Sequence, residues 1–523
     1  MNVEQQRAYD IILSHLDQTL RNLSPPPLRL LVYGEGGTGK SVIIRSVTDA
    51  FAKRGCLYLL IKSSYTRIAA SLIDGRTCHV LAQISLGRSR KLSSNSKAKL
   101  MKMWQDAKYL IIDEYSMLSK SFLANLSKNI SVAMDLNGNG NASLSFGGLS
   151  VILCGDLHQF PPVARKKTEA LFYPIDLTDT HIERQIGRNI YEEFSKVVIL
   201  KEQKRVSDDT WCSFLRRLRK GEVQDADLAM LRKLIIGSPQ SKPVNFQDDP
   251  WSSAPLITSR HAVRKMWNKL ALRKWCKKTG HHLFVCPSRD TIHDAPLTLE
   301  DRYCLAMRSK TEDSRQSNEL DDEVELAIGM MIMVTTNINT DLDITNGARG
   351  KIVDIILDPH EPPLSPDPII RLTHPPAYIL VKLDRTRAPT LDGLDNLVIP
   401  IEPSCQNISI HVPLQDGGTV QKSVKRRQYP ITGAYAFTDY RSQGQTIPFV
   451  IIDLASPPTG KLSLFNLYVA LSRSKGRSTI RLLRDFDNKI FDQQHPDVLK
   501  DKDERLILLD NETTRWWSDL HNT

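Results

Sequence analysis

The stretch LRLLVYGEGGTGKS at residues 28–41 decides the fold. It follows three consecutive prolines, begins as an apolar run typical of a buried strand, and ends in a glycine-rich turn. A helical pattern then continues from Ser41 to Lys53. A strand, a glycine-rich turn and a helix in this order form a P-loop, in which backbone N–H groups and the helix N-terminus surround phosphate groups. The stretch therefore predicts a nucleotide-binding α/β domain.

The residues of this turn have separate expected roles. Lys40 is expected to contact the β- and γ-phosphates, and Ser41 to bind Mg²⁺. The backbone N–H groups around the phosphates are expected from Gly34, Gly36, Gly37, Thr38 and Gly39.

A second apolar run, residues 110–114, ends in two carboxylates, Asp113 and Glu114. Carboxylates at the C-terminal end of a buried strand meet water at the edge of the sheet, beside the P-loop. We expect Asp113 to hold Mg²⁺ through water, and Glu114 to orient and deprotonate the attacking water. The two motifs together predict hydrolysis of a nucleoside triphosphate.

Three further side chains could complete such a site. Gln159 follows a third strand-like run at residues 150–154, and its amide could bind the γ-phosphate; the alternative is an ordinary strand-to-loop turn. Arg473 follows a helix-like apolar run and Arg205 follows another apolar stretch. Either guanidinium could stabilise charge on the transferring phosphoryl group, or be an ordinary solvated surface group.

Composition and charge narrow the class of protein. The chain has 523 residues, and its 70 lysines and arginines against 59 acidic residues give a net charge of +11, which favours a polyanionic partner. Its eight cysteines form no CxxC pair, which fits a reducing compartment. The cluster of Cys276, His281, His282 and Cys286 could be interpreted as a zinc site, but its spacing matches no common zinc finger, so we expect no structural zinc. Without a signal peptide or membrane span, the protein is expected to be soluble and intracellular.

Strand-like and helix-like segments alternate through the first 180 residues, which predicts βαβ units and a parallel, three-layer sheet. A second α/β region begins near Arg184. Around residues 346–350 the pattern changes to short alternating strands with proline-rich loops, which lasts to about Arg427 and predicts an inserted β-barrel.

An ordered set of motifs resembles superfamily 1 helicases of the Pif/RecD group, including the helicase portion of Helitron transposons. The amino-terminal motifs are NVEQ at 2–5, GEGGTGKS at 34–41, Thr66 with Ala69 and Ala70, TCH at 77–79, IIDEYSM at 111–117 and GDLHQFPPV at 155–163. The later ones are QKR at 203–205, NGARG at 346–350, SQGQT at 442–446 and YVALSRS at 468–474. The resemblance covers about residues 1–485.

This resemblance implies two RecA-like P-loop NTPase domains with two insertions. The first domain is expected at residues 1–183, with a small strand-separating wedge at about 80–102. The second is expected at 184–344 and 431–490, interrupted by an SH3-like β-barrel at 345–430, and residues 491–523 are expected to form a C-terminal tail.

The resemblance also implies a role for each motif residue. Gln5 would recognise adenine, Gln159 would join Lys40 and the carboxylates around ATP, and Arg205 and Arg473 would act as arginine fingers. The residues expected on the nucleic-acid side are Thr66, Thr77, His79, Tyr440, Arg441, Ser442 and Gln443. Tyr440 and Arg441 replace the His-Lys pair of typical relatives, and we expect Tyr440 to stack on a base.

The implied activity is that of an ATP-dependent DNA helicase that moves 5′ to 3′ and binds single-stranded and forked DNA. Repair, recombination, telomere maintenance and transposon replication are its expected settings, with a nuclear location if the source is eukaryotic. We expect a monomer that can dimerise on DNA. The alternatives are a strand translocase without unwinding and a decayed transposon-derived nucleic-acid-binding protein. The basic residues 425–427 could form a nuclear signal or a DNA contact.

Overall fold

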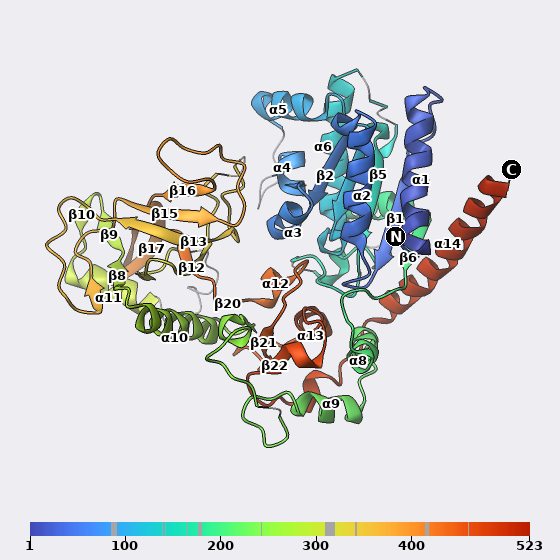
Figure 1. Ribbon diagram of the computed structural model, residues 1–523. Helices are drawn as coiled ribbons and strands as arrows, with labels where there is room; N and C mark the ends of the chain where they lie inside the picture. The colour runs from blue at the N-terminus through green and yellow to red at the C-terminus, as the bar shows by residue number, and fades with distance from the viewer. Residues whose placement is uncertain are drawn as a thin grey trace. The chain divides into compact units, whose positions relative to one another are not determined.

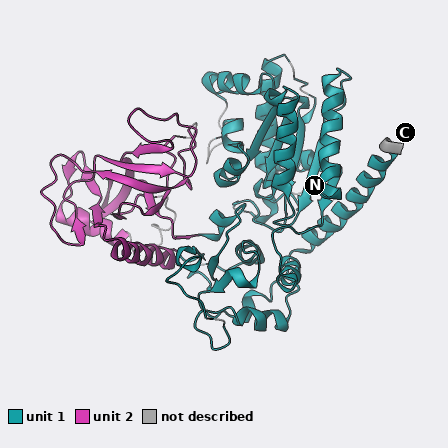
Figure 2. Cartoon of the chain, in the orientation of Figure 1, with its two compact units in different colours: residues 1–260, 438–523 teal, residues 261–437 magenta. Residues whose placement is uncertain are grey.

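The computed structural model describes residues 1–84, 92–138, 140–141, 143–164, 166–175, 180–241, 243–308, 319–339, 342–413, 418–458 and 460–522. The chain forms two compact units, Met1–Arg260 with Thr438–Thr523, and His261–Phe437 (Figure 2). The basic part of the predicted wedge, residues 85–91, lies outside the described residues.

A six-stranded parallel sheet in the order β3-β2-β4-β5-β1-β6 forms the first part of unit 1 (Figure 1). Its strands are β1 (Arg29–Gly34), β2 (Leu60–Ser64), β3 (Arg76–Thr77), β4 (Tyr109–Asp113), β5 (Ser150–Gly155) and β6 (Lys196–Leu200). The central strands are buried almost throughout, as expected when helices cover both faces of a parallel sheet. The prediction of a parallel α/β sheet is confirmed.

Alternate residues of β1 enter two different cores, which gives the three layers. Leu30 and Val32 pack with α1 (Val3–Leu20) and α2 (Lys40–Lys53). Leu31 and Tyr33 enter the opposite core, to which several further helices contribute. Among them are α5 (Ser94–Trp104), α6 (Lys120–Leu136) and α7 (Ile182–Glu192).

The strand expected at residues 57–61 begins later than predicted. A short 3₁₀ helix, Leu57–Leu59, comes first, and β2 starts at Leu60. Leu57 and Tyr58 are both exposed, so the apolar character of this run does not reflect strand burial.

A smaller parallel sheet in unit 1 contains β7 (Leu256–Thr258), β21 (Val450–Asp453) and β22 (Ile480–Leu482). Helices α8 (Asp209–Lys220), α9 (Asp225–Arg232), α12 (Asp439–Ser442) and α13 (Leu464–Leu471) belong to the same region. The sheet joins segments from both sides of unit 2 in the sequence, as expected for a second α/β domain that carries an insertion.

The predicted C-terminal tail is largely a helix, α14 (Asp497–Asn522). Thr513 Oγ1 accepts a hydrogen bond of 2.9 Å from the N–H of Val197, and Asp510 Oδ1 accepts one of 3.1 Å from the N–H of Ile199. Both donors lie on β6, the edge strand of the large sheet. Two side chains of α14 therefore pair backbone groups that an open sheet edge would leave unpaired.

Unit 2 is built mainly from antiparallel strands. Its largest sheet has the order β16-β15-β13-β12-β19, made of β12 (Met331–Val334), β13 (Arg349–Ile356), β15 (Tyr378–Leu383), β16 (Val398–Ile401) and β19 (Ile431–Gly433). A second sheet, β11-β8-β14, consists of β8 (Leu283–Pro287), β11 (Glu323–Leu326) and β14 (Ile369–Arg371). A third, β10-β9-β18-β17, consists of β9 (Arg289–Ile292), β10 (Ala295–Pro296), β17 (Ser404–Pro413) and β18 (Thr419–Gln428).

Unit 2 starts well before the predicted barrel. Leu272 on α10 (His261–Thr279) and Phe284 on β8 share one core with barrel residues such as Ile352 and Ile379. Because of this shared packing, the described residues between 261 and 344 pack within unit 2, and the bounds of the second RecA-like domain stay a prediction. Among the described residues, no helix is long and apolar enough to cross a membrane.

Candidate functional site

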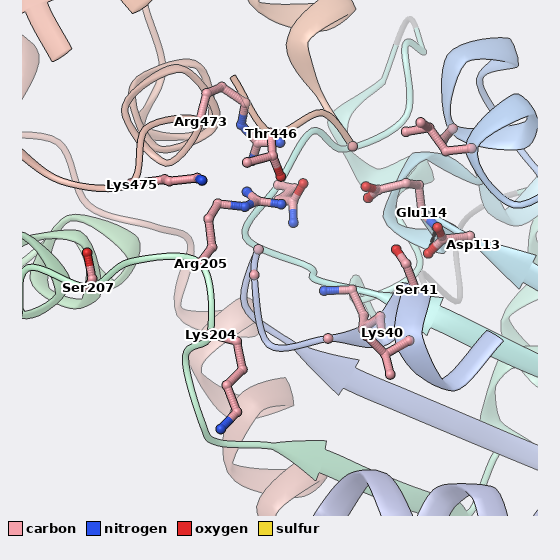
Figure 3. Close-up of a pocket in the computed structure, with 18 residues that line it drawn as sticks. Lys40, Ser41, Asp113, Glu114, Lys204, Arg205, Ser207, Thr446, Arg473 and Lys475 are labelled. Carbon is pink, nitrogen blue, oxygen red and sulfur yellow. Dashed lines mark hydrogen bonds between the residues drawn. The ribbon is translucent and has the colours of Figure 1, made fainter. Parts of the chain in front are cut away.

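A cavity of about 540 Å³ opens in unit 1, beside the ends of β1 and β4 (Figure 3). Ten predicted site residues line it: Gly36, Gly37, Gly39, Lys40, Ser41, Asp113, Glu114, Gln159, Arg205 and Arg473. Eight lining residues had no predicted role: Val42, Ala69, Leu72, Lys204, Ser207, Gly444, Thr446 and Lys475. Figure 3 shows Lys40, Ser41 and the two carboxylates on one side of the cavity, and Arg205, Arg473 and Lys475 on the other.

Lys40 is held inside the P-loop. Its ammonium group donates hydrogen bonds of 2.6 Å to the carbonyl of Gly34 and 3.0 Å to the carbonyl of Glu35. The side chain is buried, so its charge is available to the cavity and to the loop alone. Phosphate oxygens bound in the loop would be stronger acceptors for this ammonium than neutral carbonyls are.

Three donors from distant parts of the sequence converge on Gly36. A Cβ atom at this position would lie 3.3 Å from Nη2 of Arg473, 3.5 Å from Nη1 of Arg205 and 3.6 Å from Nε2 of Gln159. A glycine therefore leaves space at the point where these groups meet. The arrangement matches what a γ-phosphate requires, namely several donors directed at one place.

Gln203 is a further site residue; it belongs to the QKR motif at 203–205, which predicted no role for it. Its Nε2 donates to the carbonyl of Gly36 at 2.9 Å, and its Oε1 accepts from the N–H of Arg205 at 3.0 Å. A Cβ at Gly37, whose φ is +100°, would lie 2.1 Å from Gln203 Oε1. Gln203 thus joins the P-loop to the arginine, and the signal that pointed to it is its place in the motif.

The amide of Gln5 has partners on both sides. Its Nε2 donates to the carbonyl of Thr38 at 2.9 Å, and its Oε1 accepts from the N–H of Asn2 at 3.0 Å. The side chain of Asn2 accepts in turn from the N–H of Gln5, which completes a capping box at the start of α1. Gln5 therefore lies against the P-loop, and its recognition of adenine stays a prediction.

Asp113 and Glu114 are both buried at the edge of the sheet. Burial, followed by the neighbouring charge of Glu114, raises the pKa of Asp113 to about 7, and the charge of Lys40 opposes this shift. Glu114 has a left-handed backbone conformation with φ +53°, which is uncommon for a residue other than glycine. Two buried carboxylates beside the hydroxyl of Ser41 form a donor set suited to Mg²⁺, whose charge would relieve their repulsion.

The charge of Arg205 acts on the buried guanidinium of Arg473. Arg473 is only 1% exposed, and burial, followed by the charge of Arg205, lowers its pKa to about 9. Burial also lowers the pKa of Arg205. Arg473 is held by backbone carbonyls, with Nε donating to Val469 at 2.7 Å and Nη1 to Gln445 at 3.1 Å. Two cations held close together in this way favour the binding of a multiply charged anion between them.

The predicted nucleic-acid residues of the first domain have roles within the fold. Thr66 is the N-cap of α3 (Arg67–Leu72), and Thr77 is the N-cap of α4 (Cys78–Ala82). His79 packs between Tyr65 and Phe122, with ring centroids at 5.1 and 4.7 Å. Burial lowers the pKa of His79, so its ring is neutral at physiological pH.

Residues 440–443 make contacts within the fold, and the expected stacking of Tyr440 on a base stays a prediction. Tyr440 already stacks on a protein ring: its centroid lies 3.9 Å from that of Phe160, at an interplanar angle of 9°. Ser442 and Gln443 are buried, with exposed fractions of 0% and 2%, so these side chains offer no surface to a nucleic acid. Gln443 instead donates from Nε2 to Oε2 of Glu114 at 2.9 Å. Arg441 is partly exposed, and its DNA contact stays a prediction.

The basic residues 425–427 lie on β18, where alternate side chains point to opposite faces. Arg426 is buried and donates to both oxygens of Asp290, at 2.9 and 2.8 Å. Lys425 and Arg427 are exposed. Across the described part of the chain, no three histidine, cysteine or acidic side chains are grouped so as to hold a metal ion, and this includes the cysteines and histidines at 276–286.

Comparison with known proteins agrees with this geometry. Residues 1–227 match the family model described as PIF1-like helicase. The chain is 24% identical over 482 residues to the ATP-dependent DNA helicase PIF1 of Danio rerio, which covers 91% of this chain and 62% of that protein. It is 24% identical over 472 residues to the ATP-dependent DNA helicase Pif1 of Campylobacter jejuni, which covers 86% of this chain and 87% of that protein.

The fold is shared with solved structures. The crystal structure of Pif1 helicase from Candida albicans matches with a TM-score of 0.61 at 23% identity, covering 96% of this chain and 99% of that one. That of Bacteroides Pif1 bound to ssDNA matches with a TM-score of 0.60 at 20% identity, covering 96% of each chain. The prediction of two RecA-like domains is thereby confirmed, whereas the wedge, the SH3-like barrel and the likeness to Helitron transposons stay predictions. This chain spans 62% of the length of the Danio rerio protein and 60% of that from Xenopus laevis. By its motifs, fold and relatives, the chain is similar to PIF1-like helicases.

Proposed function

We propose that this chain is an ATP-dependent DNA helicase that moves 5′ to 3′ along a single strand and unwinds duplex DNA. The convergence of Arg205, Arg473 and Gln159 on Gly36 carries this proposal, because these three side chains come from separate segments of the chain. A site assembled in this way can sense whether a γ-phosphate is present. Loss of that phosphate then changes how the segments are held together, which is the basis of a motor.

ATP hydrolysis would use each group of the cavity in turn. Lys40 exchanges its carbonyl partners for oxygens of the β- and γ-phosphates, and Glu114 accepts the proton of the attacking water. Arg205 and Arg473 stabilise the charge that develops on the transferring phosphoryl group. Ser41 and Asp113 would hold Mg²⁺, and the bound ion would further neutralise this charge.

The partners we propose are single-stranded and forked DNA, bound by a chain that is a monomer in solution and can pair with a second copy on DNA. The net charge of +11 supports a polyanionic partner. The settings that fit such an activity are DNA repair, recombination and telomere maintenance, in the nucleus if the source is eukaryotic.

The decisive experiment is unwinding of forked substrates that carry either a 5′ or a 3′ single-stranded tail. The 5′ tail should support ATP-dependent strand displacement, and the 3′ tail should not. Equal displacement from both tails would contradict the polarity. An ATPase that single-stranded DNA stimulates without any displacement would favour the translocase, and binding without hydrolysis would favour the decayed remnant.

A further inference from the structure

Residues 439–445, which we name the α12 segment, comprise the short helix α12 and the three residues after it. This segment contacts the general base, one arginine and the ring that follows Gln159. All of these residues belong to unit 1. A single short segment therefore lies against several groups that we assign to hydrolysis.

Its first contact is with the base. Nε2 of Gln443 donates a hydrogen bond of 2.9 Å to Oε2 of Glu114, and both side chains are buried. The Oε1 atom of Gln443 is buried without a hydrogen-bond partner among the described residues. An unpaired buried oxygen is costly. The Nε2 atom of the Gln443 amide is therefore paired with Glu114, whereas its Oε1 atom gains no hydrogen bond in this position.

The second contact is with Arg473. Its Nη1 donates to the carbonyl of Ser442 at 3.4 Å and to that of Gln445 at 3.1 Å. These carbonyls flank Gln443, so the arginine and the base are attached to adjacent points of one backbone. Displacement of the α12 segment would move both groups together.

The third contact lies at the outer end of the segment. Tyr440 is 40% exposed, and its ring stacks on Phe160, the residue after Gln159. Oε1 of Gln159 is also buried without a partner among the described residues. The exposed part of Tyr440 can therefore be touched from outside, while its ring stacks on Phe160, which directly follows the residue expected to bind the γ-phosphate.

We propose that Gln443 restrains Glu114 while no strand is bound, and that a single strand reaching Tyr440 releases this restraint. The hydrogen bond occupies Oε2 and holds the carboxylate against the α12 segment, whereas hydrolysis requires this carboxylate to accept the proton of water. Part of the stimulation of hydrolysis by DNA then consists of breaking the Gln443–Glu114 bond. This inference rests on the proposed function, because it needs an ATPase that responds to DNA.

The test compares ATP turnover with and without single-stranded oligothymidine in the parent chain and in Gln443→Met. Methionine keeps the length of the side chain but removes the N–H donor. A hydrogen bond to a charged group is worth about one to two powers of ten, so basal turnover should rise about tenfold or more. Stimulated turnover should stay within about twofold of the parent, so that the ratio of stimulated to basal turnover falls by a similar factor.

Gln443→Ala gives a second variant, and Gln421→Ala, which changes an exposed glutamine on β18, gives the matched control. If basal and stimulated turnover both fall in the Gln443 variants, the amide positions Glu114 for catalysis and the restraint is wrong. An unchanged ratio with a responsive parent overturns the restraint alone. A parent whose hydrolysis ignores single-stranded DNA would overturn the proposed function, and the restraint with it.

Discussion

Two groups of motif residues in unit 1 differ in what their side chains do. One group, which we call the phosphate side, lines the cavity; the other, which we call the strand side, holds the residues expected to contact a nucleic-acid strand. On the phosphate side, ten predicted residues line one cavity. On the strand side, Thr66 and Thr77 cap helices, His79 packs against two rings, and Tyr440 stacks on Phe160. Motifs therefore predicted the position of the first group well. The residues of the second group, for which motifs predicted contacts with a nucleic acid, also have contacts inside the fold.

The reason is that different forces position the two groups. The carboxyl ends of parallel strands meet at one edge of a sheet, so Gly34 and Asp113 must lie near each other once β1 and β4 share a sheet. Backbone topology thus fixes the phosphate side. On the strand side, the direction of Tyr440 depends on which ring lies beside it, and one sequence does not reveal that Phe160 is this neighbour.

The largest loss of ATP turnover is expected from substitutions on the phosphate side, and Glu114→Gln tests this side of the comparison. Glutamine keeps the shape of the side chain but is a very poor proton acceptor, so turnover should fall by at least ~100-fold while ATP still binds. Steady-state hydrolysis and equilibrium binding of ATP measure the two quantities separately.

Lys40→Ala is the companion variant, which should abolish hydrolysis because the phosphate charge loses its main partner. Near-normal turnover in either variant would mean that the cavity is not the catalytic site.

A smaller effect is expected from the titration of Asp113. Its pKa in the nucleotide-free fold is about 7, above its ordinary value of 3.8. A raised folded-state pKa means that this group's contribution to stability is complete below about pH 3.8 and is lost as the pH rises through 7. Mg²⁺ binds the ionised carboxylate. The apparent affinity for Mg²⁺ in ATP binding should therefore fall by up to about tenfold for each pH unit below 7.

Titrations of ATP binding with Mg²⁺ at several pH values between 6 and 8 would measure this effect. Asp113→Asn removes the titrating group and should make the Mg²⁺ dependence weak and nearly constant over the same range. A parent chain with a flat profile between these pH values would show that Asp113 is already ionised in the free protein, or that it does not hold the ion.

The sequence predicted the large sheet, the P-loop and the order of the motifs, because these follow from periodicity and from glycines whose conformation a turn requires. It did not predict the extent of unit 2, since Leu272 and Phe284 join the core of that unit through tertiary packing rather than through any local pattern. The role of α14 was missed for the same reason. The fact that Thr513 and Asp510 pair N–H groups of β6 depends on where the helix docks.

Within the site, Gln203 and Gln443 mark the limit of motif reasoning. Both were quoted in motifs, but their partners, the carbonyl of Gly36 and the carboxylate of Glu114, are far away in the sequence. An amide can donate or accept, so its residue type alone does not indicate which group it meets. A lysine in a P-loop is different, because the loop itself specifies the partner.

The smallest expected effect sharpens the comparison most, and it concerns the Tyr440–Phe160 stack. A stacked aromatic pair contributes about 0.5–1.5 kcal/mol beyond the area that it buries. A double-mutant cycle of Tyr440→Ala and Phe160→Ala, with the affinity for a single-stranded oligonucleotide and the free energy of unfolding as its two measurements, separates two uses of Tyr440. If the ring acts through Phe160, the two substitutions are strongly non-additive in both measurements, since each removes the same contact. If the ring acts on a base instead, Tyr440→Ala weakens DNA binding by about tenfold or more even when Phe160 is already alanine. Tyr440→Phe keeps the ring and should preserve the coupling, so that a loss in this variant would implicate the hydroxyl group rather than either stack. The ring of Tyr440 lies 3.9 Å from that of Phe160 and is 40% exposed, so both contacts have surface available and the cycle decides between them.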